Sequence, residues 1–466
     1  MATIAQSRIK TLVEREASRY FADRPKSRAL FERAKKSLLA GVPMSAMSLW
    51  VGSFPIFVTA GNGAYLTDVD GHRYLDLCLG DTGAMMGHTP KATIEAASKQ
   101  MQEGMTYWLP TEDSIWVAEE LTRRFGLQYW QVLLSASDAN QVAISVARDV
   151  TQRYPILVFD GCYHGHVPES RLGFMNGEVW PRARSPEDTI EVRGGVVWRG
   201  KHADGPLPNQ ATGTRVIQFN DLDALEAALS TREIACVLCE PAMTNVGIIL
   251  PDPGYHTALR ELTRRYGTLL IIDETHTICG GHTGLTRPWH LEPDIFTLGK
   301  PIAGGIPAAV MGVSDRVAKE LIGTTKGREL KLGGRTLAGS AFQLAAMRAT
   351  LEHVLTESNY KRMIPLGQRL AEGVDKIIKA NDLPWHVIYL GCRAEYRWTR
   401  TPPRNGKEAR AAFNAGLHEL VHLFFLNRGI LLTPPHSMVL ISPDTTAEDV
   451  DFHNRVFGEF VDELLK

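Results

Sequence analysis

The sequence has no excess of charge of either sign, because 51 Lys and Arg residues balance 52 Asp and Glu residues. A chain without such a bias lacks the electrostatic attraction that a nucleic acid or an anionic membrane surface requires. The sequence also has no apolar run of about eighteen residues, the minimum for a membrane span, and residues 1–10 lack the apolar core of a signal peptide. We therefore expect a cytoplasmic protein with small-molecule partners and with no nucleic-acid or membrane partner.

Cysteine is scarce, with six residues among 466. Cys236 and Cys239 have the spacing of a redox or metal-binding pair, but they lie in an apolar, strand-like run without a second pair. Buried small side chains explain this pair better. His164 and His166 also have a spacing found in metal sites, yet no third ligand is in view, so we predict no metal.

The middle of the chain alternates between strand-like and helix-like patterns. Apolar residues at 139, 142, 143, 146 and 150 have helical spacing. Apolar runs predict strands at 132–134, 156–159, 234–238 and 269–272. This alternation predicts a mostly parallel central sheet with helices on both faces, which defines the α/β class. We assign this large domain to residues 76–338.

The two ends of the chain, residues 1–75 and 339–466, predict a smaller α+β domain. Its expected elements are, in chain order, a charged amphipathic helix over 5–40, a hairpin over 61–71, a long helix after 339, and strand-rich segments at 385–398 and 429–442. A last helix begins at Thr446, and we expect Thr445 and Glu448 to form its capping box.

Two apolar runs of the large domain end on residues that carry chemistry. Residues 269–272 are followed by Asp273, and residues 295–298 are followed by Gly299 and Lys300. Ligands of open α/β sheets bind at the carboxyl ends of the strands, so a carboxylate and an amine that arrive there indicate a site. Pyridoxal phosphate (PLP) needs this pair: a lysine forms a Schiff base with its aldehyde, and an aspartate keeps its pyridine nitrogen protonated. A surface lysine that follows a strand is the simpler alternative.

The neighbouring residues favour the PLP interpretation. A Gly-rich turn covers residues 300–307, and residues 273–277 read Asp-Glu-Thr-His-Thr. With these residues the chain resembles the class III aminotransferases, whose fold is called type I among PLP enzymes. The resemblance runs from about Gly41 to the C-terminus. It implies PLP as the cofactor, with Lys300 and Asp273 as the catalytic residues.

The resemblance also implies which residues hold the cofactor. Residues 135–139, Ser-Ala-Ser-Asp-Ala, open a helix whose N-terminus could hold a phosphate. They resemble the family's Ser-Gly-Thr-Glu-Ala, in which the Gly and Thr positions, here Ala136 and Ser137, bind the cofactor phosphate. Tyr163 and His164 match the family's Tyr-His-Gly, whose aromatic ring stacks on the pyridine. Residues 240–245 resemble Glu-Pro-Val-x-Gly-Asn, in which the asparagine reaches the phenolic oxygen. The expected cofactor-binding residues are Ser135, Ala136, Ser137, Tyr163, His164, Glu240, Asn245, Asp273, Thr275, His276, Lys300 and Thr336.

Several positions depart from the family pattern. Ala136 and Thr244 each replace a glycine. Thr275 and His276 stand where the family commonly has Val and Gln. We expect the threonine methyl group to pack on the ring, and His276 to tune the Schiff base or to contact the substrate. We therefore expect the PLP chemistry to be retained, although the contacts around the cofactor ring differ from those of the family.

Two further segments extend the expected site. Residues 333–339 resemble a family turn in which a threonine, here Thr336, donates to the phosphate of the neighbouring subunit. The resemblance thus implies a homodimer with shared active sites. Residues 166–214 are rich in Gly, Pro and Arg and show neither helical nor strand periodicity. Because long loops of this kind are often functional, we predict a loop that faces the substrate and contains short strands at 190–192 and 195–198.

The expected activity is that of an aminotransferase, which moves an amino group from an amine or amino acid to the carbonyl of a keto acid or aldehyde. Lys300 is expected to hold the cofactor and then to act as base and acid in the proton shift. An aminomutase of the glutamate-1-semialdehyde type, or a racemase, would use the same cofactor residues. A non-catalytic protein of this fold is a further alternative, which the retained Lys300 and Asp273 disfavour.

The sequence indicates the substrate-binding residues less clearly than the cofactor-binding residues. The motifs are most similar to the branch of glutamate-1-semialdehyde aminomutases and β-amino-acid aminotransferases, which usually carries a carboxylate-binding arginine in the segment that here spans 43–54. This segment contains no arginine. Either the substrate lacks that carboxylate, or another arginine supplies the contact. Our candidates are Arg393 and Arg397 for a carboxylate, and Trp50, Tyr107 and Trp108 for an aromatic pocket, with ordinary packing as the alternative for all five.

Overall fold

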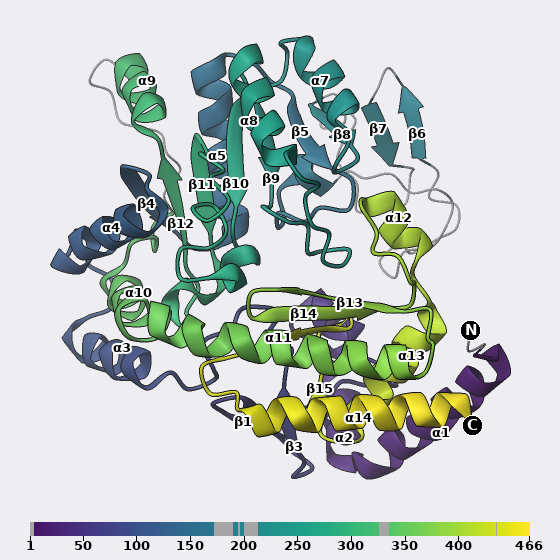
Figure 1. Cartoon of the computed structure of the whole chain (residues 1–466). Helices are drawn as coiled ribbons and strands as arrows, with labels where there is room; N and C mark the ends of the chain where they lie inside the picture. The colour runs from purple at the N-terminus through teal and green to yellow at the C-terminus, as the bar shows by residue number, and fades with distance from the viewer. Residues whose placement is uncertain (1–3, 172–189, 194–195, 200–212, 326–334, 435) are drawn as a thin grey trace. The chain divides into compact units, whose positions relative to one another are not determined.

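The computed structural model of the chain describes residues 4–171, 190–193, 196–199, 213–325, 335–434 and 436–466 (Figure 1). Contacts within the chain separate two compact units. The first unit consists of Met1–Pro90, Ser358–Pro402 and Ala412–Lys466, and the second consists of Lys91–Glu357 and Pro403–Ala411. The domain limits expected from the sequence, after residues 75 and 338, stay a prediction.

A seven-stranded sheet forms the centre of the second unit, with the strand order β4-β12-β11-β10-β9-β5-β8. Its strands are β4 (Tyr129–Leu133), β5 (Ile156–Phe159), β8 (Thr214–Ile217), β9 (Cys236–Cys239), β10 (Leu269–Asp273), β11 (Ile295–Leu298) and β12 (Ala309–Val313). Strand β12 runs antiparallel to both of its neighbours, and the other neighbouring pairs are parallel. The predicted α/β fold with a mostly parallel sheet is confirmed.

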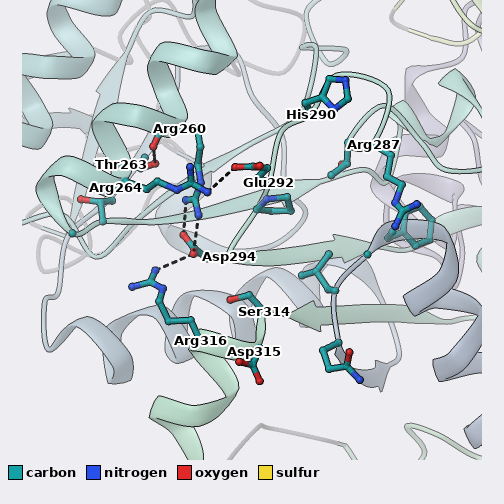
Figure 2. A pocket seen from close by; sticks show the side chains of 18 residues that line it. Arg260, Thr263, Arg264, Arg287, His290, Glu292, Asp294, Ser314, Asp315 and Arg316 are labelled. Carbon is teal, nitrogen blue, oxygen red and sulfur yellow. Dashed lines mark hydrogen bonds and ion pairs between the residues drawn. The ribbon is translucent and has the colours of Figure 1, made fainter.

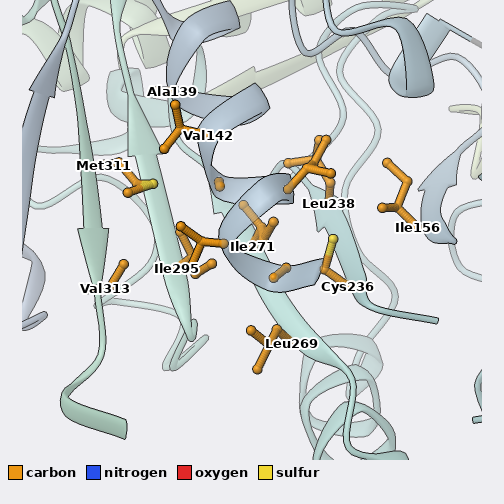
Figure 3. Close-up of a cluster of buried hydrophobic side chains, with 14 of the residues drawn as sticks. Ala139, Val142, Ile156, Cys236, Leu238, Leu269, Ile271, Ile295, Met311 and Val313 are labelled. Carbon is orange, nitrogen blue, oxygen red and sulfur yellow. The ribbon is translucent and has the colours of Figure 1, made fainter. Parts of the chain in front are cut away.

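Helices cover both faces of this sheet (Figure 1). The helices of the second unit are α3 (Lys91–Glu103), α4 (Glu112–Phe125), α5 (Ala136–Thr151), α7 (Leu222–Ser230), α8 (Tyr255–Tyr266), α9 (Asp315–Thr325), α10 (Ala341–His353) and α12 (Gly406–Ala411). Side chains of α5 and α9 form a buried cluster with one face of the sheet, and side chains of α7 and α8 form another with the opposite face. Figure 3 shows the first cluster, in which Ala139 and Val142 of α5 pack with Ile271, Ile295 and Met311 of the sheet.

The alternation of side chains along β9 explains the cysteine pair. Cys236 belongs to the cluster on the α5 face, whereas Cys239 belongs to the cluster on the α7 and α8 face. Both are fully buried free thiols, and burial raises the pKa of each. Because residues three apart point to opposite faces of a strand, the two thiols do not converge on a common ligand. Their interpretation as buried small side chains is confirmed.

A short segment from the C-terminal half of the chain, residues 403–411, belongs to the second unit although the residues on either side belong to the first. Helix α12 forms most of this segment. Arg410 forms an ion pair with the buried carboxylate of Asp160, directly after β5. Arg404 forms a second ion pair, with Asp252. These contacts fasten the segment to loops that are about 150 to 250 residues away in the sequence.

The first unit contains two small sheets, with the strand orders β1-β2-β3-β15 and β13-β14-β16. Its strands are β1 (Val58–Asn62), β2 (Tyr65–Asp68), β3 (Arg73–Asp76), β13 (His386–Leu390), β14 (Arg393–Arg397), β15 (Ile430–Leu431) and β16 (Met438–Leu440). Its helices are α1 (Gln6–Asp23), α2 (Pro25–Ala34), α11 (Glu357–Ala380), α13 (Ala415–Leu426) and α14 (Ala447–Leu465). The hairpin expected over 61–71 lies within the antiparallel β1-β2-β3 meander.

The helix expected over residues 5–40 is divided into α1 and α2. The division falls at Arg24, immediately before Pro25, because proline has no amide hydrogen and disfavours a helical conformation in the preceding residue. Arg24 is buried and its guanidinium donates to Tyr74 Oη at 3.1 Å and to Asn427 Oδ1 at 3.0 Å. The expectation of one continuous helix was therefore wrong.

The capping box of α14 lies one residue later than expected. Thr446 Oγ1 accepts a hydrogen bond from the amide of Asp449, and the Asp449 carboxylate accepts one from the amide of Thr446. Thr445 Oγ1 instead accepts from the amide of Ser442. The prediction of Thr445 and Glu448 as the box was wrong because both residue pairs fit the same spacing, and the preceding turn uses Thr445.

Strands β6 (Ile190–Arg193) and β7 (Val196–Arg199) agree within one residue with the short strands expected at 190–192 and 195–198, and the two strands pair antiparallel. Most of the loop that was predicted to face the substrate lies outside the described residues, namely residues 172–189, 194–195 and 200–212. Within the described residues, no helix is both long and apolar enough to cross a bilayer.

Two buried histidines of the first unit make stability depend on pH. His422 and His453 are almost fully buried, and burial lowers the pKa of each from 6.5 to about 4. The unfolded chain therefore binds more protons than the folded chain between these values, so stability is complete above about pH 6.5 and falls as the pH approaches 4. We expect the midpoint of urea unfolding to fall over this range. The side chain of His453 lies among the rings of Tyr396 and Phe425, so His453→Phe should make the urea midpoint depend less on pH. Urea midpoints that fall equally with pH in the variant and the wild type would contradict this prediction.

Candidate active site

Asp273, the last residue of β10, is a buried carboxylate held by three donors. His164 Nδ1 lies 2.9 Å and Asn140 Nδ2 2.8 Å from Asp273 Oδ2. The amide of Thr275 donates to Asp273 Oδ1 at 3.0 Å. These contacts bring together the ends of three elements, the loop after β5, helix α5 and the end of β10. The carboxylate is thus fixed in one orientation.

The Asp273–His164 pair is ionised. Burial opposes a charge on Asp273, but hydrogen bonds from His164, Thr275 and Asn140 lower its pKa to about 2. Burial likewise opposes a charge on His164, while Cys162 and the Asp273 carboxylate favour it and raise the pKa of the imidazole to about 10. Near neutral pH the pair is therefore a carboxylate beside an imidazolium, with little net charge.

The sequence prediction did not include Asn140. Its side chain donates to Asp273, and its Oδ1 accepts from Thr297 Oγ1 of β11 at 2.7 Å, so it connects two neighbouring strands. The available signal was a polar residue on the apolar face of α5, between Ala139 and Val142. Buried polar side chains of this kind are almost always hydrogen-bonded.

Lys300 follows β11 and faces the loop after β10. Its Nζ lies 2.6 Å from Nε2 of His276. The parallel register pairs Asp273 with Thr297, so the two strands end side by side. Lys300 has a φ of 48°, an uncommon conformation for a residue other than glycine and one that concentrates at functional sites. The structure therefore brings Lys300, His276 and Asp273 to the same edge of the sheet, as expected.

Thr275 ties the two strand ends together. Its Oγ1 accepts a hydrogen bond from the amide of Gly299 at 3.2 Å. A Cβ atom on Gly299 would lie 2.9 Å from the Cβ of Ala136, so only glycine allows this approach to the first residue of α5. The hydroxyl of Thr275 thus has a positioning role that the sequence did not reveal.

Glu274 organises the loop that follows β10. Its buried carboxylate accepts hydrogen bonds from Thr277 Oγ1 at 2.5 Å, from the amide of Leu285 at 2.7 Å and from the amide and hydroxyl of Thr286. Burial raises the pKa of Glu274, and these donors oppose the rise. Because the carboxylate joins residues up to twelve positions apart, it fixes the loop that carries His276.

The N-terminus of α5 has the features of an anion site. Ser135 caps the helix by accepting from the amide of Asp138, as expected for a strand that leads directly into a helix. Ser137 Oγ accepts from the amide of His166 at 3.0 Å. A Cβ on Gly165 would lie 2.0 Å from that oxygen, so glycine permits the close approach. Backbone amides, a hydroxyl and the positive end of the helix dipole meet at this point.

The segment after β9 is held by its own side chains. Thr244 Oγ1 donates to Glu240 Oε2 at 2.5 Å, which explains a threonine where a glycine is common. Glu240 is buried, and burial raises its pKa to about 7. Asn245 Nδ2 donates to the carbonyl of Gly161 at 3.1 Å, two residues before Tyr163. The structure therefore brings the Glu240 and Tyr163 motifs together within the second unit.

The predicted substrate residues are distributed over both units. Trp50, in the first unit, is half-buried against the cluster of Tyr20, Phe54 and Tyr74, whereas Tyr107 and Trp108 belong to the second unit and are exposed. Thr336 is also exposed. Arg393 is fully buried and donates to Thr82 Oγ1, and Arg397 pairs with Glu395 at 3.2 Å. The roles assigned to these residues stay predictions. Both arginines are buried, and Arg397, with 6% of its surface exposed against none for Arg393, is slightly the more accessible of the two.

Other positions of the described chain do not compete with this site. Within the described residues, no group of three His, Cys, Asp or Glu side chains is arranged to hold a metal ion. A cavity of about 1060 Å³ lies at the opposite ends of β10 and β11, where Asp294 precedes β11 (Figure 2). Figure 2 shows that Asp294 already pairs with Arg260 and Arg316, at 2.8 Å and 2.9 Å. The buried carboxylate of this cavity is thus already neutralised by two arginines.

Several known proteins are similar to this chain over nearly its whole length. Residues 46–417 match the family model for class III aminotransferases. A glutamate-1-semialdehyde aminomutase from Pseudomonas aeruginosa PAO1, of known crystal structure, is 44% identical over 99% of both chains, with a TM-score of 0.91. A glutamate-1-semialdehyde 2,1-aminomutase from Desulfitobacterium hafniense is 32% identical over 92% of this chain and 96% of its own. An omega-transaminase from Sphaerobacter thermophilus is 27% identical, with a TM-score of 0.84 over 94% of this chain and 98% of its own.

The chain belongs to the class III aminotransferase family, whose members depend on PLP. The structure of a variant of the Pseudomonas protein, in which a lysine is replaced by alanine, has been solved in complex with pyridoxamine phosphate (PMP). The expected family, fold and cofactor are thereby confirmed, and the chain is an enzyme of this family.

Proposed function

We propose that the chain is a PLP-dependent aminomutase, which moves an amino group between neighbouring carbons of one substrate. The observation that carries this proposal is the 44% identity to the Pseudomonas aminomutase over 99% of both chains, against 27% identity to the omega-transaminase. The aminotransferase activity expected from the sequence is therefore the second candidate. Both reactions would use the same residues at the ends of β10 and β11.

The residues of the second unit suit PLP. The N-terminus of α5 and the hydroxyl of Ser137 offer donors for the phosphate, and Gly165 and Gly299 pack directly against Ser137 and Ala136, where a Cβ atom would collide. The ionised carboxylate of Asp273 suits a protonated pyridine nitrogen, and Lys300 offers an amine for the aldehyde. When bound, the cofactor supplies an electron sink for the carbon that carries the amino group.

The remaining chemistry belongs to the protein. Lys300 would bind the cofactor covalently and, once displaced by an amine, carry a proton between the substrate carbon that bears nitrogen and the carbon of the cofactor's former aldehyde group. Asp273, oriented by Asn140 and His164, would keep the proton on the ring nitrogen. Tyr163 would cover one ring face and exclude water. These roles are inferred from the chemical type of each residue and from their common position at the carboxyl ends of the strands.

The second candidate, transfer to a separate carbonyl acceptor, is favoured by one observation. Residues 43–54 contain no arginine, whereas glutamate-1-semialdehyde carries a carboxylate that an arginine would bind well. An amine or amino acid without that group would not need one. Arg397 is the alternative partner for a substrate carboxylate, and it would have to share its guanidinium with Glu395.

Two substrate mixtures separate the two candidates. The cofactor-loaded protein is incubated with glutamate-1-semialdehyde alone and, in a second mixture, with glutamate-1-semialdehyde and a keto acid, and the products are separated by retention time, since the aminomutase product is an isomer of the substrate. An aminomutase should yield 5-amino-4-oxopentanoate, in which the amino group has moved from carbon 2 to carbon 1. An aminotransferase should instead require a separate keto acid and should release a new amino acid from it. Conversion only in the second mixture would replace the first proposal by the second.

Arg397→Met tests the carboxylate contact. If Arg397 binds a substrate carboxylate, the KM for substrates with that group should rise about tenfold or more, while plain amines are converted as before. Arg397→Lys should restore binding only in part, because an ammonium lacks the bidentate geometry. Arg369→Met serves as the control, since its exposed side chain pairs with Asp451 and its loss should not change the KM for any substrate. An unchanged KM in Arg397→Met would favour the aromatic pocket of Trp50, Tyr107 and Trp108.

A homodimer is proposed from the resemblance and from an exposed apolar segment. Trp108 is 85% exposed and Leu109 71% exposed, beside Met105 and Tyr107. Apolar side chains grouped in this way usually mark an interaction surface. We expect Trp108→Asp to shift the protein from dimer to monomer in light scattering, whereas Leu222→Asp, at a separate exposed leucine, should not. A wild-type monomer, or a dimer that tolerates Trp108→Asp, would contradict this surface.

A further inference from the structure

The geometry points to His276 as the proton-exchange partner of the Lys300 amine, a role that rests on the proposed function and deepens it. His276 Nε2 lies 2.6 Å from Lys300 Nζ, so the imidazole touches the atom that would bind the cofactor. The family commonly has other side chains at this position, and the sequence alone left His276 between the cofactor and the substrate. The contact assigns it to the lysine.

A hydrogen bond between these two nitrogens requires a shared proton. An imidazolium and an ammonium would present hydrogen to hydrogen, so one of the two groups must offer a lone pair. Lys300 is an effective nucleophile only as the neutral amine. Movement of one proton from Nζ to Nε2 creates that amine and an imidazolium, and its return restores the ammonium. The step needs no other reactant and changes no oxidation state.

Hydrogen bonds of the neighbouring residues hold His276 and Lys300 in place. Thr275, one residue before His276, is fixed through Asp273 and through the amide of Gly299. Gly299 in turn precedes Lys300. On the other side of His276, Thr277 donates to the buried carboxylate of Glu274. The two side chains therefore project from segments that are tied to each other on both sides, which is the arrangement expected for efficient proton transfer.

The charged groups on the neighbouring strand ends are engaged in contacts of their own. Asp273 accepts from His164, Asn140 and Thr275, and Glu274 accepts from Thr277, Leu285 and Thr286. Glu240, after β9, accepts from Thr244. His164 is paired with Asp273. Cys162 and Cys239 also lie within electrostatic reach of His164 and Asp273, and all of these groups must be kept constant when the Lys300–His276 pair is tested.

Two substitutions separate proton exchange from simple packing. His276→Gln keeps an acceptor of similar length beside Nζ but cannot take up the proton, and His276→Ala removes the contact. His282→Gln is the matched control, because it removes a histidine from the same loop. All four proteins are prepared without cofactor, and their folding is compared by circular dichroism and thermal unfolding.

The readout is the rate at which Lys300 captures PLP, which requires no turnover. Each cofactor-free protein is mixed with PLP between pH 6 and 10, the covalent product is reduced with borohydride, and the labelled peptide is quantified by mass spectrometry. We expect His276→Gln and His276→Ala to label Lys300 about tenfold more slowly near neutral pH and to recover the wild-type rate at high pH. His282→Gln should follow the wild-type profile.

The possible results are distinguishable. A wild-type pH profile in folded His276→Gln and His276→Ala would overturn the role of His276 and leave the proposed function intact. A profile that is restored by His276→Gln alone would also overturn it, because a hydrogen-bond acceptor would then suffice. Label on a lysine other than Lys300 in the wild type would instead overturn the proposed function. If His276→Ala fails to fold, the comparison of His276→Gln with wild type decides the question.

Discussion

Lys300→Ala is expected to give a folded protein that binds PLP without the absorbance of lysine-bound cofactor. The phosphate donors at α5 and the carboxylate of Asp273 do not depend on the Lys300 side chain, so noncovalent binding should persist. The amination rate should fall roughly 10⁴-fold or more, because one substitution removes both the covalent attachment and the proton carrier. Single-turnover rates and the cofactor spectrum measure the two effects separately.

Lys319→Ala is the matched control for the loss of a lysine. Lys319 lies on α9 and pairs with Asp315 on the protein surface, so its removal should change neither spectrum nor rate. Near-normal turnover in Lys300→Ala would place the catalytic lysine elsewhere and would remove the basis of both proposals. Loss of activity together with loss of the folded state would be recognised from thermal unfolding.

Asp273→Asn is expected to have the second largest effect. A neutral amide cannot hold a proton on the ring nitrogen, so the electron sink weakens, and the rate should fall roughly 100-fold or more. The affinity for PLP should fall as well. The substitution also leaves the buried imidazole of His164 without its carboxylate partner, which adds a cost in stability. Turnover, the cofactor dissociation constant and the unfolding midpoint should all be measured.

Asp294→Asn controls for the loss of a buried carboxylate in the same sheet. Asp294 lies at the opposite ends of the strands, where it pairs with Arg260 and Arg316. Its substitution should lower stability without a change in the rate of the folded, loaded enzyme. If Asp273→Asn behaved in the same way, with full activity at saturating cofactor, Asp273 would be a structural residue.

The pH dependence of stability gives a further test of the Asp273–His164 pair. The pKa of Asp273 is lowered from 3.8 to about 2, so its contribution is complete above the unfolded value and is lost as the pH falls toward 2. The pKa of His164 is raised from 6.5 to about 10, so its contribution is complete below about 6.5 and is lost as the pH rises toward 10. Between about pH 4 and 6.5 both contributions are present. Asp273→Asn should reduce the stability most in this window.

The sequence predicted the strands of the large sheet well because their signals are local. The apolar runs at 156–159 and 295–298 coincide with β5 and β11, and the acid and the amine follow β10 and β11 as expected. Parallel strands necessarily bring their carboxyl ends to one edge, so the grouping of Asp273 and Lys300 followed from fold class. Helix boundaries were less predictable, since the choice between Thr445 and Thr446 as the N-cap depends on the preceding turn.

The supporting contacts of the site were not predictable from local patterns. Asn140 reaches Asp273 across 133 residues of sequence, and the positions of both are set by the packing of α5 on the sheet. The Lys300–His276 contact likewise depends on side-chain directions at two loop positions. The substrate residues stay predictions because they are distributed over both units of the chain, and local sequence patterns do not show which of them contact a substrate.

The placement of residues 403–411 in the second unit has a consequence for attempts to isolate the PLP-binding half of the protein. A fragment that ends near residue 357 would lack Arg410 and Arg404, the ion-pair partners of Asp160 and Asp252. It would also leave the Asp160 carboxylate, just after β5 and near the Tyr163 motif, without its arginine. A minimal fragment should therefore be a fusion in which a linker rejoins residues 403–411 to residues 91–357, rather than a simple truncation.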